Sequence, residues 1–429
     1  MLIFLKIIYN LIFIPFLKLV IKFNNHFKKN NRDNSIINLY KYINNISNEK
    51  KRIWFHASSM GEFEQAKPII ELLKEQYKEV VIICTFFSPS GYENQKYYQF
   101  ADFTSYIPID SKKNAKEFID NIKPDLAVFV RYDLWINMFK QLKLDGAKIF
   151  LINATIPGSY FKFYFKYFKS YFNYAYSFID DIYCFNQESF NYFKTYNLNL
   201  NLLLSSDTRL DRISQIVSEA KKSKNILVKL RKSNVKYLVA GSSWEHDENL
   251  IIKAVNEVNN DSEQIKVIFV PHKPTEDNIS RLSSQLNNSI LYSKIEIMSD
   301  DEFNNLNFSH IIVDKMGILL KLYSIADIAY VGCGFGDGVH STAEPAGYGI
   351  PIISGPNIQK SPDAVQLQKN GGLILIENEI ELKIIIQKLI SDDSFYNLTC
   401  KQSLEYINQN IGSSEHIVSR IGEAIYGYK

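Results

Sequence analysis

Apolar runs separated by mixed segments recur along most of the chain, and their lengths predict buried β-strands joined by helices. In the first half we expect strands at 53–57, 80–85, 126–130 and 148–153, with a helix at 65–77. Continuous apolar strands alternating with helices are typical of βαβ units, because such strands are covered on both faces. The first half is therefore expected to be a parallel sheet covered by helices.

A second series of the same kind follows residue 207. Its expected strands are 237–241, 266–271, 311–313, 328–332 and 351–354. No sequence repeat relates the two series and no low-complexity linker separates them, so the join is placed within 199–236. The chain is thus predicted to be an α/β protein with two Rossmann-like parallel-sheet domains, and the cleft between two such domains is the default active site.

The N-terminal stretch 2–23 has a different pattern, since Leu, Ile and Phe dominate it. As a helix it is long enough to cross a bilayer, and the basic residues that follow, through Arg32, would hold the rest of the chain in the cytoplasm. Lys6 and Lys18 within the stretch leave a helix in the membrane surface as an alternative. A buried core helix is the third reading. We expect a membrane anchor at 1–32, a domain at 33–206 and a second domain at 207–429, whose last helix can pack back on the first.

Composition narrows the function classes. The 429 residues are 46% hydrophobic and carry a formal net charge of +3, which is too small to indicate a nucleic-acid partner. The cysteines are widely spaced and show no paired metal-ligand spacing, as expected in a reducing compartment without disulfides: Cys84, Cys184, Cys333 and Cys400.

A glycine cluster between Tyr330 and Pro356 is the first candidate site. An apolar strand runs into Gly332, Gly334, Gly336 and Gly338. Glycines permit positive φ and close approach of a ligand, and a helix starting near Ser341 would direct free N–H groups at a phosphate. Glu344 would then accept hydrogen bonds from ribose hydroxyls. The alternative is a strand-to-helix turn that binds nothing.

The second candidate is the segment SSMGE at 58–62, which joins the first strand to the first long helix. Ser59 and Glu62 have the spacing of a capping box, in which each side chain accepts a hydrogen bond from the other's backbone N–H. The functional reading is that Glu62 removes a proton from an acceptor hydroxyl, with the helix dipole keeping the carboxylate ionised.

A third candidate is the aromatic and basic stretch 159–178. Read as a helix, it places Lys162, Lys166 and Lys169 on one face among Phe and Tyr rings. This face suits the boundary of a membrane and the lipid phosphates found there. The alternative is a helix that packs its rings into the core while the lysines face water.

Taken in order, the motifs resemble the lipopolysaccharide Kdo transferase family, where Kdo is 3-deoxy-D-manno-octulosonic acid. They are WFHASSMGE at 54–62, YIPID at 106–110, LWIN at 134–137, DKMG at 314–317, the glycine cluster through Glu344-Pro345, Gly355-Pro356, and NIGS at 410–413. Each motif alone is weak, but the ordered set is specific and covers nearly the whole chain after residue 32.

The resemblance implies a GT-B glycosyltransferase at the cytoplasmic face of the bacterial inner membrane. It would transfer Kdo from CMP-Kdo to a lipid A precursor, with inversion and with Glu62 as the catalytic base. The positions that match the family's CMP contacts are Pro271, His272, Met316, Gly317, Ile318, Ser341, Thr342, Ala343 and Glu344. A monophosphate leaving group needs no metal bridge and the chain has no Asp-x-Asp, so we expect no metal and no cofactor, CMP-Kdo being the donor substrate.

Three positions depart from the commonest family pattern. Arg131 stands where many members have a glutamate linked to transition-state stabilisation, Arg209 where many have a lysine, and Ser341 where an asparagine is usual. Arg209 keeps a cation that can pair with phosphate or the Kdo carboxylate. For Arg131 two roles stay open: it binds a lipid or donor anion, or it pairs with Asp133. Two rival functions follow, another GT-B nucleotide-sugar enzyme and a catalytically silent nucleotide-binding paralogue.

Overall fold

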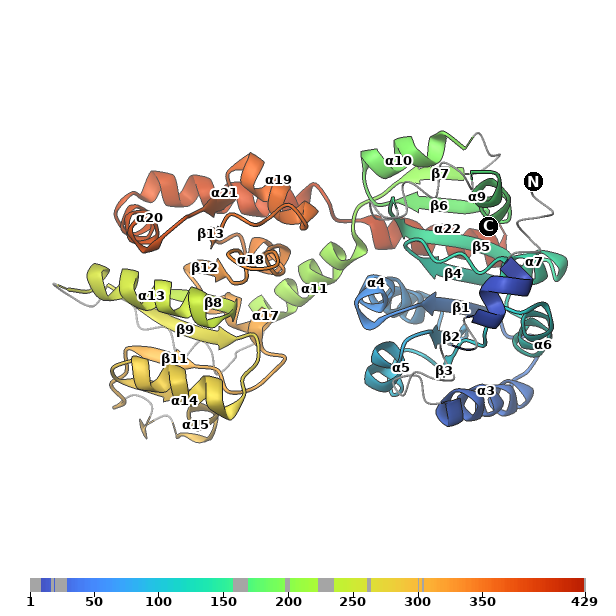
Figure 1. Ribbon diagram of the computed structural model, residues 1–429, viewed down its shortest axis with the longest axis horizontal. Coiled ribbons are helices and arrows are strands. Elements are labelled where there is room, and N and C mark those ends of the chain that lie inside the picture. Colours follow the sequence, from blue (N-terminus) through green and yellow to red (C-terminus); the bar gives the residue numbers. More distant parts are fainter. Residues whose placement is uncertain are drawn as a thin grey trace. The chain divides into compact units, whose positions relative to one another are not determined.

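The computed structural model describes residues 9–16, 19, 29–156, 169–196, 201–222, 235–260, 264–299, 301–302 and 305–427. The chain divides into two compact units (Figure 1). Unit 1 comprises Met1–Arg212 and Ile411–Lys429, and unit 2 comprises Ile213–Asn410. Each unit is built on its own parallel sheet, so the expected α/β class with two such sheets is confirmed.

The sheet of unit 1 has the strand order β3-β2-β1-β4-β5-β6-β7, with every pairing parallel among the described residues. Its strands are β1 (Arg52–Ala57), β2 (Val81–Phe86), β3 (Phe103–Tyr106), β4 (Leu126–Val130), β5 (Lys148–Ala154), β6 (Asp181–Cys184) and β7 (Asn201–Leu204). The helices of the unit are α3 (Lys29–Asn44), α4 (Met60–Gln76), α5 (Pro89–Gln95), α6 (Lys112–Ile122), α7 (Ile136–Leu144), α9 (Lys169–Tyr176), α10 (Gln187–Lys194) and α22 (Ser413–Tyr426). Helix α11 (Thr208–Lys222) leads from unit 1 into unit 2.

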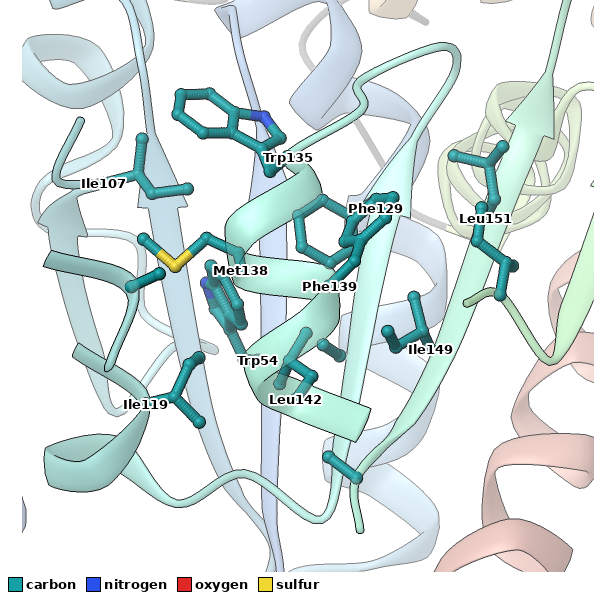
Figure 2. Close-up of a cluster of buried hydrophobic side chains, with 14 of the residues drawn as sticks. Trp54, Ile107, Ile119, Phe129, Trp135, Met138, Phe139, Leu142, Ile149 and Leu151 are labelled. Carbon is teal, nitrogen blue, oxygen red and sulfur yellow. The ribbon is translucent and has the colours of Figure 1, made fainter. Parts of the chain in front are cut away.

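Side chains alternate between the two faces of this sheet, and each face is buried under helices. On β1, Trp54 packs with α6 and α7, whereas Ile53 and Phe55 pack with α4 and α22. Figure 2 shows the first of these clusters, with Trp135 at the start of α7 and Phe139 and Leu142 further along the helix. A sheet buried on both faces explains why its strands read as continuous apolar runs.

The C-terminal helix α22 belongs to unit 1 although it follows unit 2 in the sequence. The Asp211 carboxylate accepts hydrogen bonds from the backbone N–H groups of Gly412 and Ser414, and Ser413 Oγ accepts one from Ser206 N at 2.8 Å. Gly412 has a φ of +100°, which glycine adopts without strain. The NIGS motif thus forms the start of a helix that packs on α4.

At the N-terminus, the described part of the predicted anchor contacts the core of unit 1. Residues Tyr9–Phe13 form a turn of π-helix, and Ile14 is buried. The Tyr9 hydroxyl donates to Asp110 Oδ2 at 2.6 Å, and Asn137 Nδ2 donates to Asn10 Oδ1 at 3.0 Å. Much of 1–28 lies outside the described residues. Among the helices that are described, none has the length and apolar character needed to cross a bilayer.

The sheet of unit 2 has the order β10-β11-β9-β8-β12-β13-β14 and is again parallel where described. Its strands are β8 (Lys236–Ser243), β9 (Ile265–Pro271), β10 (Ser289–Leu291), β11 (His310–Ile312), β12 (Ile328–Val331), β13 (Ile352–Ser354) and β14 (Leu373–Leu375). Its helices are α13 (Glu245–Val258), α14 (Glu276–Gln285), α15 (Tyr292–Ile297), α17 (Leu319–Leu322), η3 (Tyr323–Ile325), α18 (Ala343–Tyr348), α19 (Pro362–Asn370), α20 (Glu379–Ser391) and α21 (Asp393–Asn408).

In each sheet, the first strands of the unit are added on one side of its first strand, and the later strands are added on the other side. This change of side lies between β1 and β4 in unit 1, and between β8 and β12 in unit 2. Ligands of open α/β sheets bind outside the carboxyl ends of the strands at such a switch point. The two places to look for chemistry are therefore the loops after β1 and β4, and the loops after β8 and β12.

All the strands expected from apolar runs form within two residues of their predicted limits. The sequence reading did not propose β3, β6, β7, β10 and β14, which are short or less apolar. The helix expected in 159–178 is described only as α9, and 157–168 lie outside the described residues.

Candidate functional site

The switch point of unit 1 brings Glu62 and Asp133 to the carboxyl ends of neighbouring strands. Strands β1 and β4 pair directly, with His56 opposite Phe129. Glu62 lies in the first turn of the helix that follows β1, and Asp133 lies in the loop that follows β4. Their charges interact, because the Asp133 carboxylate raises the pKa of Glu62.

Glu62 is both a capping residue and a buried acid. Its Oε2 accepts a hydrogen bond from Ser59 N at 3.1 Å, and Ser59 Oγ accepts one from Glu62 N at 3.4 Å, so the predicted capping box is confirmed. Burial raises the pKa of Glu62 to about 7, with Asp133 adding to the rise, while Arg131 and the backbone N–H groups of Ser58 and Ser59 lower it. Burial outweighs the helix terminus that was expected to keep the carboxylate ionised. Such a group can accept and release a proton near neutral pH.

Asp133 is held by Ser58 and faces His56. The Ser58 hydroxyl donates to Asp133 Oδ2, and His56 Nε2 lies 3.4 Å from the same oxygen without forming a hydrogen bond to it. On the other side of the ring, His56 Nδ1 lies 2.9 Å from Thr85 Oγ1, which also accepts from Trp54 Nε1 at 2.7 Å. Thr85 Oγ1 thus contacts His56 Nδ1, and it also donates to the Phe55 carbonyl at 3.5 Å.

The carboxylate of Asp110 holds the start of α7, the helix that follows the loop carrying Asp133. The carboxylate of Asp110 accepts hydrogen bonds from Asn137 N at 3.0 Å and Met138 N at 2.9 Å, so it caps α7, for which Trp135 provides no side-chain cap. Burial raises the pKa of Asp110 to about 7, while the hydrogen bonds it accepts lower that pKa. The Trp135 ring makes an edge contact with His56, with 5.1 Å between ring centroids. The YIPID and LWIN motifs thus meet in one support for the loop.

Arg131 and Arg209 are joined through two side chains of unit 1. Arg131 Nε donates to Gln65 Oε1 at 2.9 Å, and Gln65 Nε2 donates to Asp207 Oδ2 at 3.2 Å. Arg209 Nε donates to the same Asp207 oxygen at 2.8 Å. Two roles are open for Arg131, binding of a lipid or donor anion and pairing with Asp133. The structure contradicts the second role: among the described residues, Asp133 contacts Ser58 and His56 and forms no ion pair with Arg131.

In unit 2 the glycine cluster follows β12 and is anchored by Asp247. The Asp247 carboxylate accepts hydrogen bonds from Cys333 N at 3.0 Å, Trp244 N at 3.0 Å and the Tyr330 hydroxyl at 2.9 Å. It therefore ties the start of α13 to the loop after β12. Trp244 and Asp247 lie outside the sequence-predicted set; the signal for them was an aromatic residue and a carboxylate at the helix start after the apolar strand β8.

Close packing explains more of the four glycines than positive φ does. Only Gly338 among them has a positive φ, of +134°, and the non-glycine Cys333 has one of +69°. A Cβ at Gly332 would lie 2.3 Å from Ser242 O, and one at Gly334 would lie 2.4 Å from Ser354 Oγ. Gly332 and Gly334 are instead needed where the loop touches β8 and the end of β13.

A group of stacked rings lies beside this loop. His272 stacks on Trp244 at 4.9 Å and on His340 at 4.5 Å between ring centroids, with interplanar angles of 22° and 14°. Trp244 Nε1 donates a hydrogen bond to His340 Nε2 at 3.4 Å. Burial, and then the neighbouring His272, lower the pKa of His340. His272 follows β9, and its backbone N–H donates to Ser243 O, at the end of β8, at 2.9 Å.

The remaining predicted donor residues lie on three loops of unit 2. Pro271 ends β9, and Gly317, with a φ of +87°, and the exposed Met316 precede α17. The expected helix at Ser341 begins at Ala343 and has six residues, with Thr342 at its N-cap. The Thr342 hydroxyl is buried without a hydrogen-bond partner. Ser341 is exposed, whereas Ile318 and Glu344 are half-buried.

Of the predicted acceptor residues, Lys162 and Lys166 lie outside the described residues. Lys169 is exposed at the start of α9, and its Nζ lies 6.0 Å from the centroid of the Tyr196 ring. Within the described part of the chain, no group of three His, Cys, Asp or Glu side chains is placed to hold a metal ion.

Comparisons with known proteins agree with the motifs. Residues 34–212 match the family described as 3-deoxy-D-manno-octulosonic-acid transferase (kdotransferase). The chain is 29% identical over 352 residues to the 3-deoxy-D-manno-octulosonic acid transferase of Aquifex aeolicus, covering 81% of this chain and 88% of that protein. It is 25% identical to the protein of the same name from Rickettsia prowazekii, covering 87% and 79%.

Solved structures support the fold. A UDP-GlcNAc 2-epimerase from Neisseria meningitidis has a TM-score of 0.59 and 14% identity, covering 86% of this chain and 99% of that one. A glycosyltransferase from Rickettsia africae has a TM-score of 0.54 and 13% identity, covering 89% and 100%. The two parallel sheets are thus GT-B-like. The predicted resemblance to the Kdo transferase family is confirmed over most of the chain, and the protein is an enzyme of the glycosyltransferase class.

Proposed function

We propose that this enzyme transfers Kdo from CMP-Kdo to a primary hydroxyl of a lipid A precursor, with inversion at the anomeric carbon. The observation that carries the proposal is Glu62: a buried carboxylic acid with a pKa of about 7 at the switch point of a parallel sheet. The assignment of Kdo as the transferred sugar rests on relatives named as Kdo transferases. The assignment of the lipid A precursor and of CMP rests on the resemblance to the family.

In the proposed reaction the ionised Glu62 accepts the proton of the acceptor hydroxyl. The hydroxyl oxygen forms a bond to the anomeric carbon of Kdo while the bond from that carbon to the phosphate oxygen of CMP breaks. CMP leaves with the electron pair, and Glu62 keeps the proton until it exchanges with water. A single displacement with one base inverts the anomeric configuration. The hydrogen bond from Ser59 N directs the carboxylate, so part of its orientation is set before substrate binds.

Unit 2 is proposed to hold the donor. The loop after β12 carries His340, which stacks on His272, and Met316 and Gly317 are exposed in the loop before α17. Aromatic rings and backbone N–H groups are the partners that a cytosine base and a monophosphate require. The fold likeness to an epimerase carries no substrate information.

A mass-resolved assay with CMP-Kdo and a lipid A precursor tests the function. The wild-type chain should add Kdo, and Glu62→Ala should lose at least 100-fold in kcat while its Kd for CMP changes less than threefold. Glu75→Ala is the matched control, because Glu75 is an exposed carboxylate on the same helix. Near-normal turnover by Glu62→Ala would show that another group is the base.

Nucleotide binding tests the donor separately. Titration of the purified protein with CMP and with UDP should give tighter binding of CMP. Preference for UDP, together with no product from CMP-Kdo, would instead favour another nucleotide-sugar enzyme. CMP binding with no transfer by the wild-type chain would favour the catalytically silent paralogue.

A further inference from the structure

The guanidinium groups of Arg131 and Arg209 are held at the switch point of unit 1 by one bridge of Gln65 and Asp207. We infer that this arginine pair binds an oxyanion of a substrate, a carboxylate or a phosphate, beside the proposed base Glu62. The inference rests on the proposed function for the identity of the substrate, but the anion site itself is argued from the contacts of the two arginines.

Arg131 is fixed in an uncommon backbone conformation. It has a φ of +65°, which side chains other than glycine, asparagine and aspartate rarely adopt, and its N–H donates to Ile152 O at 2.9 Å. Such strain persists only where the surroundings over-determine it, and it concentrates at ligand sites. The conformation turns the chain at the end of β4, and the side chain then meets Gln65.

Among the described residues, only one nitrogen atom of the Arg131 guanidinium has a hydrogen-bond partner. Nε donates to Gln65, whereas Nη1 and Nη2 make no hydrogen bond to any described residue. The nearby carboxylate of Asp133 is engaged by Ser58 and His56, so it does not occupy this fork. Two adjacent N–H donors on a planar cation are the geometry that binds a carboxylate or phosphate through two hydrogen bonds.

The bridge under the pair is rigid. The Thr208 hydroxyl donates to the backbone carbonyl of Gln65 and accepts from Asn153 Nδ2 at 2.8 Å, and both ends of the Gln65 amide are hydrogen-bonded. Asp207 is buried, and Arg209 binds it through Nε and through its backbone N–H at 2.9 Å. Because the side chains of the bridge are oriented within the protein, the position of the Arg131 fork is set before a ligand arrives.

Within the described residues no carboxylate forms an ion pair with the Arg131 guanidinium, which is hydrogen-bonded to the neutral amide of Gln65. Arg209, in contrast, is paired with the buried carboxylate of Asp207. The charge of Arg131 also interacts with Glu62, whose pKa is about 7, so this acid is mostly neutral below that pH. Partial burial of Arg131 strengthens its attraction for an anion.

Two substrate groups have the required chemistry. The donor sugar carries a carboxylate, and a lipid A precursor carries phosphates. Both groups can accept two hydrogen bonds from a guanidinium. The structure therefore indicates an oxyanion, and kinetic measurements decide whether the donor or the acceptor carries it. A donor carboxylate predicts that Arg131→Gln raises KM for CMP-Kdo. An acceptor phosphate predicts that the same variant raises KM for the lipid, with the KM for CMP-Kdo unchanged.

Direct anion binding tests the site without turnover. The full-length protein is titrated calorimetrically with free Kdo, with its carboxamide, and with inorganic phosphate. We expect wild-type protein to bind free Kdo or phosphate at least tenfold more tightly than Arg131→Gln does, with Arg131→Lys between them. Lys116→Gln is the control for net charge, because Lys116 is an exposed residue paired with Asp120, and it should bind as the wild type does.

Several outcomes would overturn the inference. One is equal binding of both anions by wild type and Arg131→Gln; another is the same loss in Lys116→Gln as in Arg131→Gln. Arg131→Glu, which reverses the charge, should bind neither anion, and anion binding by it would also refute the site. If Arg131→Gln does not fold, Arg131→Lys keeps the charge and decides the question. Below the Glu62 pKa of about 7, where the wild-type acid is mostly neutral, Glu62→Gln should bind the anions as the wild type does. A failure of the base assignment and a failure of this inference therefore give different results.

Discussion

Ser59 and Glu62 hydrogen-bond each other across the first turn of α4, with Ser59 N donating to Glu62 Oε2 at 3.1 Å and Glu62 N donating to Ser59 Oγ at 3.4 Å. The capping and catalytic readings of this pair are compatible. The cap orients the carboxylate that the proposed reaction needs, and burial with Asp133 nearby brings its pKa to about 7. Sequence spacing gave the cap, whereas the burial that suits Glu62 to proton transfer is a tertiary property.

Replacing Ser59 separates the cap from the base. Ser59→Ala removes the side-chain acceptor for Glu62 N and should lower the free energy of unfolding by about 1 kcal/mol. Because the Glu62 carboxylate remains, kcat should fall by less than tenfold, far less than in Glu62→Ala. Urea denaturation and the transfer assay measure the two effects. A loss of kcat as large as that of Glu62→Ala would mean that kcat depends on the cap rather than on the carboxylate.

Replacing Asp133 should shift the pH dependence of the reaction. A general base must be deprotonated, so kcat/KM should rise with pH through the Glu62 pKa of about 7. Asp133→Asn removes a negative charge that raises this pKa. The acid limb of the profile, over which kcat/KM rises with pH, should therefore move to lower pH. Asp120→Asn, an exposed carboxylate in the same unit, should leave the limb in place. An unshifted limb in Asp133→Asn would refute the coupling.

The same pKa predicts the direction of a stability change. The Glu62 pKa is raised from its ordinary value of 4.5 to about 7 on folding, so the folded state binds more protons than the unfolded state between these values. Glu62 therefore contributes stability that is fully present below about pH 4.5 and is lost as pH rises through about 7. Glu62→Gln cannot titrate, and its free energy of unfolding should decrease less over this range. Equal pH dependence in both proteins would contradict the raised pKa.

Local patterns predicted much of the fold, because strands buried on both faces read as apolar runs. The short strand β10 has half-buried residues and β7 has exposed ends, so neither shows that pattern. In the site, Glu62 and the loops proposed to bind nucleotide were predicted from the family motifs, and their roles stay predictions. The Gln65 and Asp207 bridge could not be predicted, since those residues are far apart in sequence and Gln65 lies inside a helix. Nor did the glycine pattern reveal that Gly332 and Gly334 serve packing.

The contact between Tyr9 and Asp110 should support the loop that carries Asp133. Tyr9→Phe removes a hydrogen bond to a buried carboxylate and should lower the free energy of unfolding by about 1 to 3 kcal/mol. Since Asp110 also caps α7, the amides of Asn137 and Met138 should exchange faster with solvent deuterium. Tyr97→Phe, at an exposed tyrosine, is the control. Unchanged exchange at both amides would show that the N-terminal segment does not support α7.

Two exposed side chains near the N-terminus test the proposed membrane association. Leu11 and Phe16 are 70% and 61% exposed, so Leu11→Glu with Phe16→Glu should reduce sedimentation with membranes without a change in Tm. These substitutions are sharper than deletion of 1–32, which also removes Tyr9 and the buried Arg32 from the core. Leu144→Glu, at a side chain 69% exposed in the same unit, should sediment as the wild type does. Unchanged sedimentation of the double variant would exclude these residues from the membrane contact.

Two glycines of the same loop should respond differently to alanine. At Gly334 a Cβ would lie 2.5 Å from the backbone nitrogen of Gly355, which cannot move away without displacing the end of β13. At Gly336 the nearest atom is the Cys333 Sγ, at 3.3 Å, and a side chain can shift by the few tenths of an ångström required. Gly334→Ala should therefore weaken CMP binding at least tenfold, and Gly336→Ala should change it less than threefold. Calorimetric titration of both variants with CMP, after thermal unfolding has confirmed that each is folded, measures the difference. Equal affinities would show that the packing of Gly334 on Gly355 does not shape the proposed donor site.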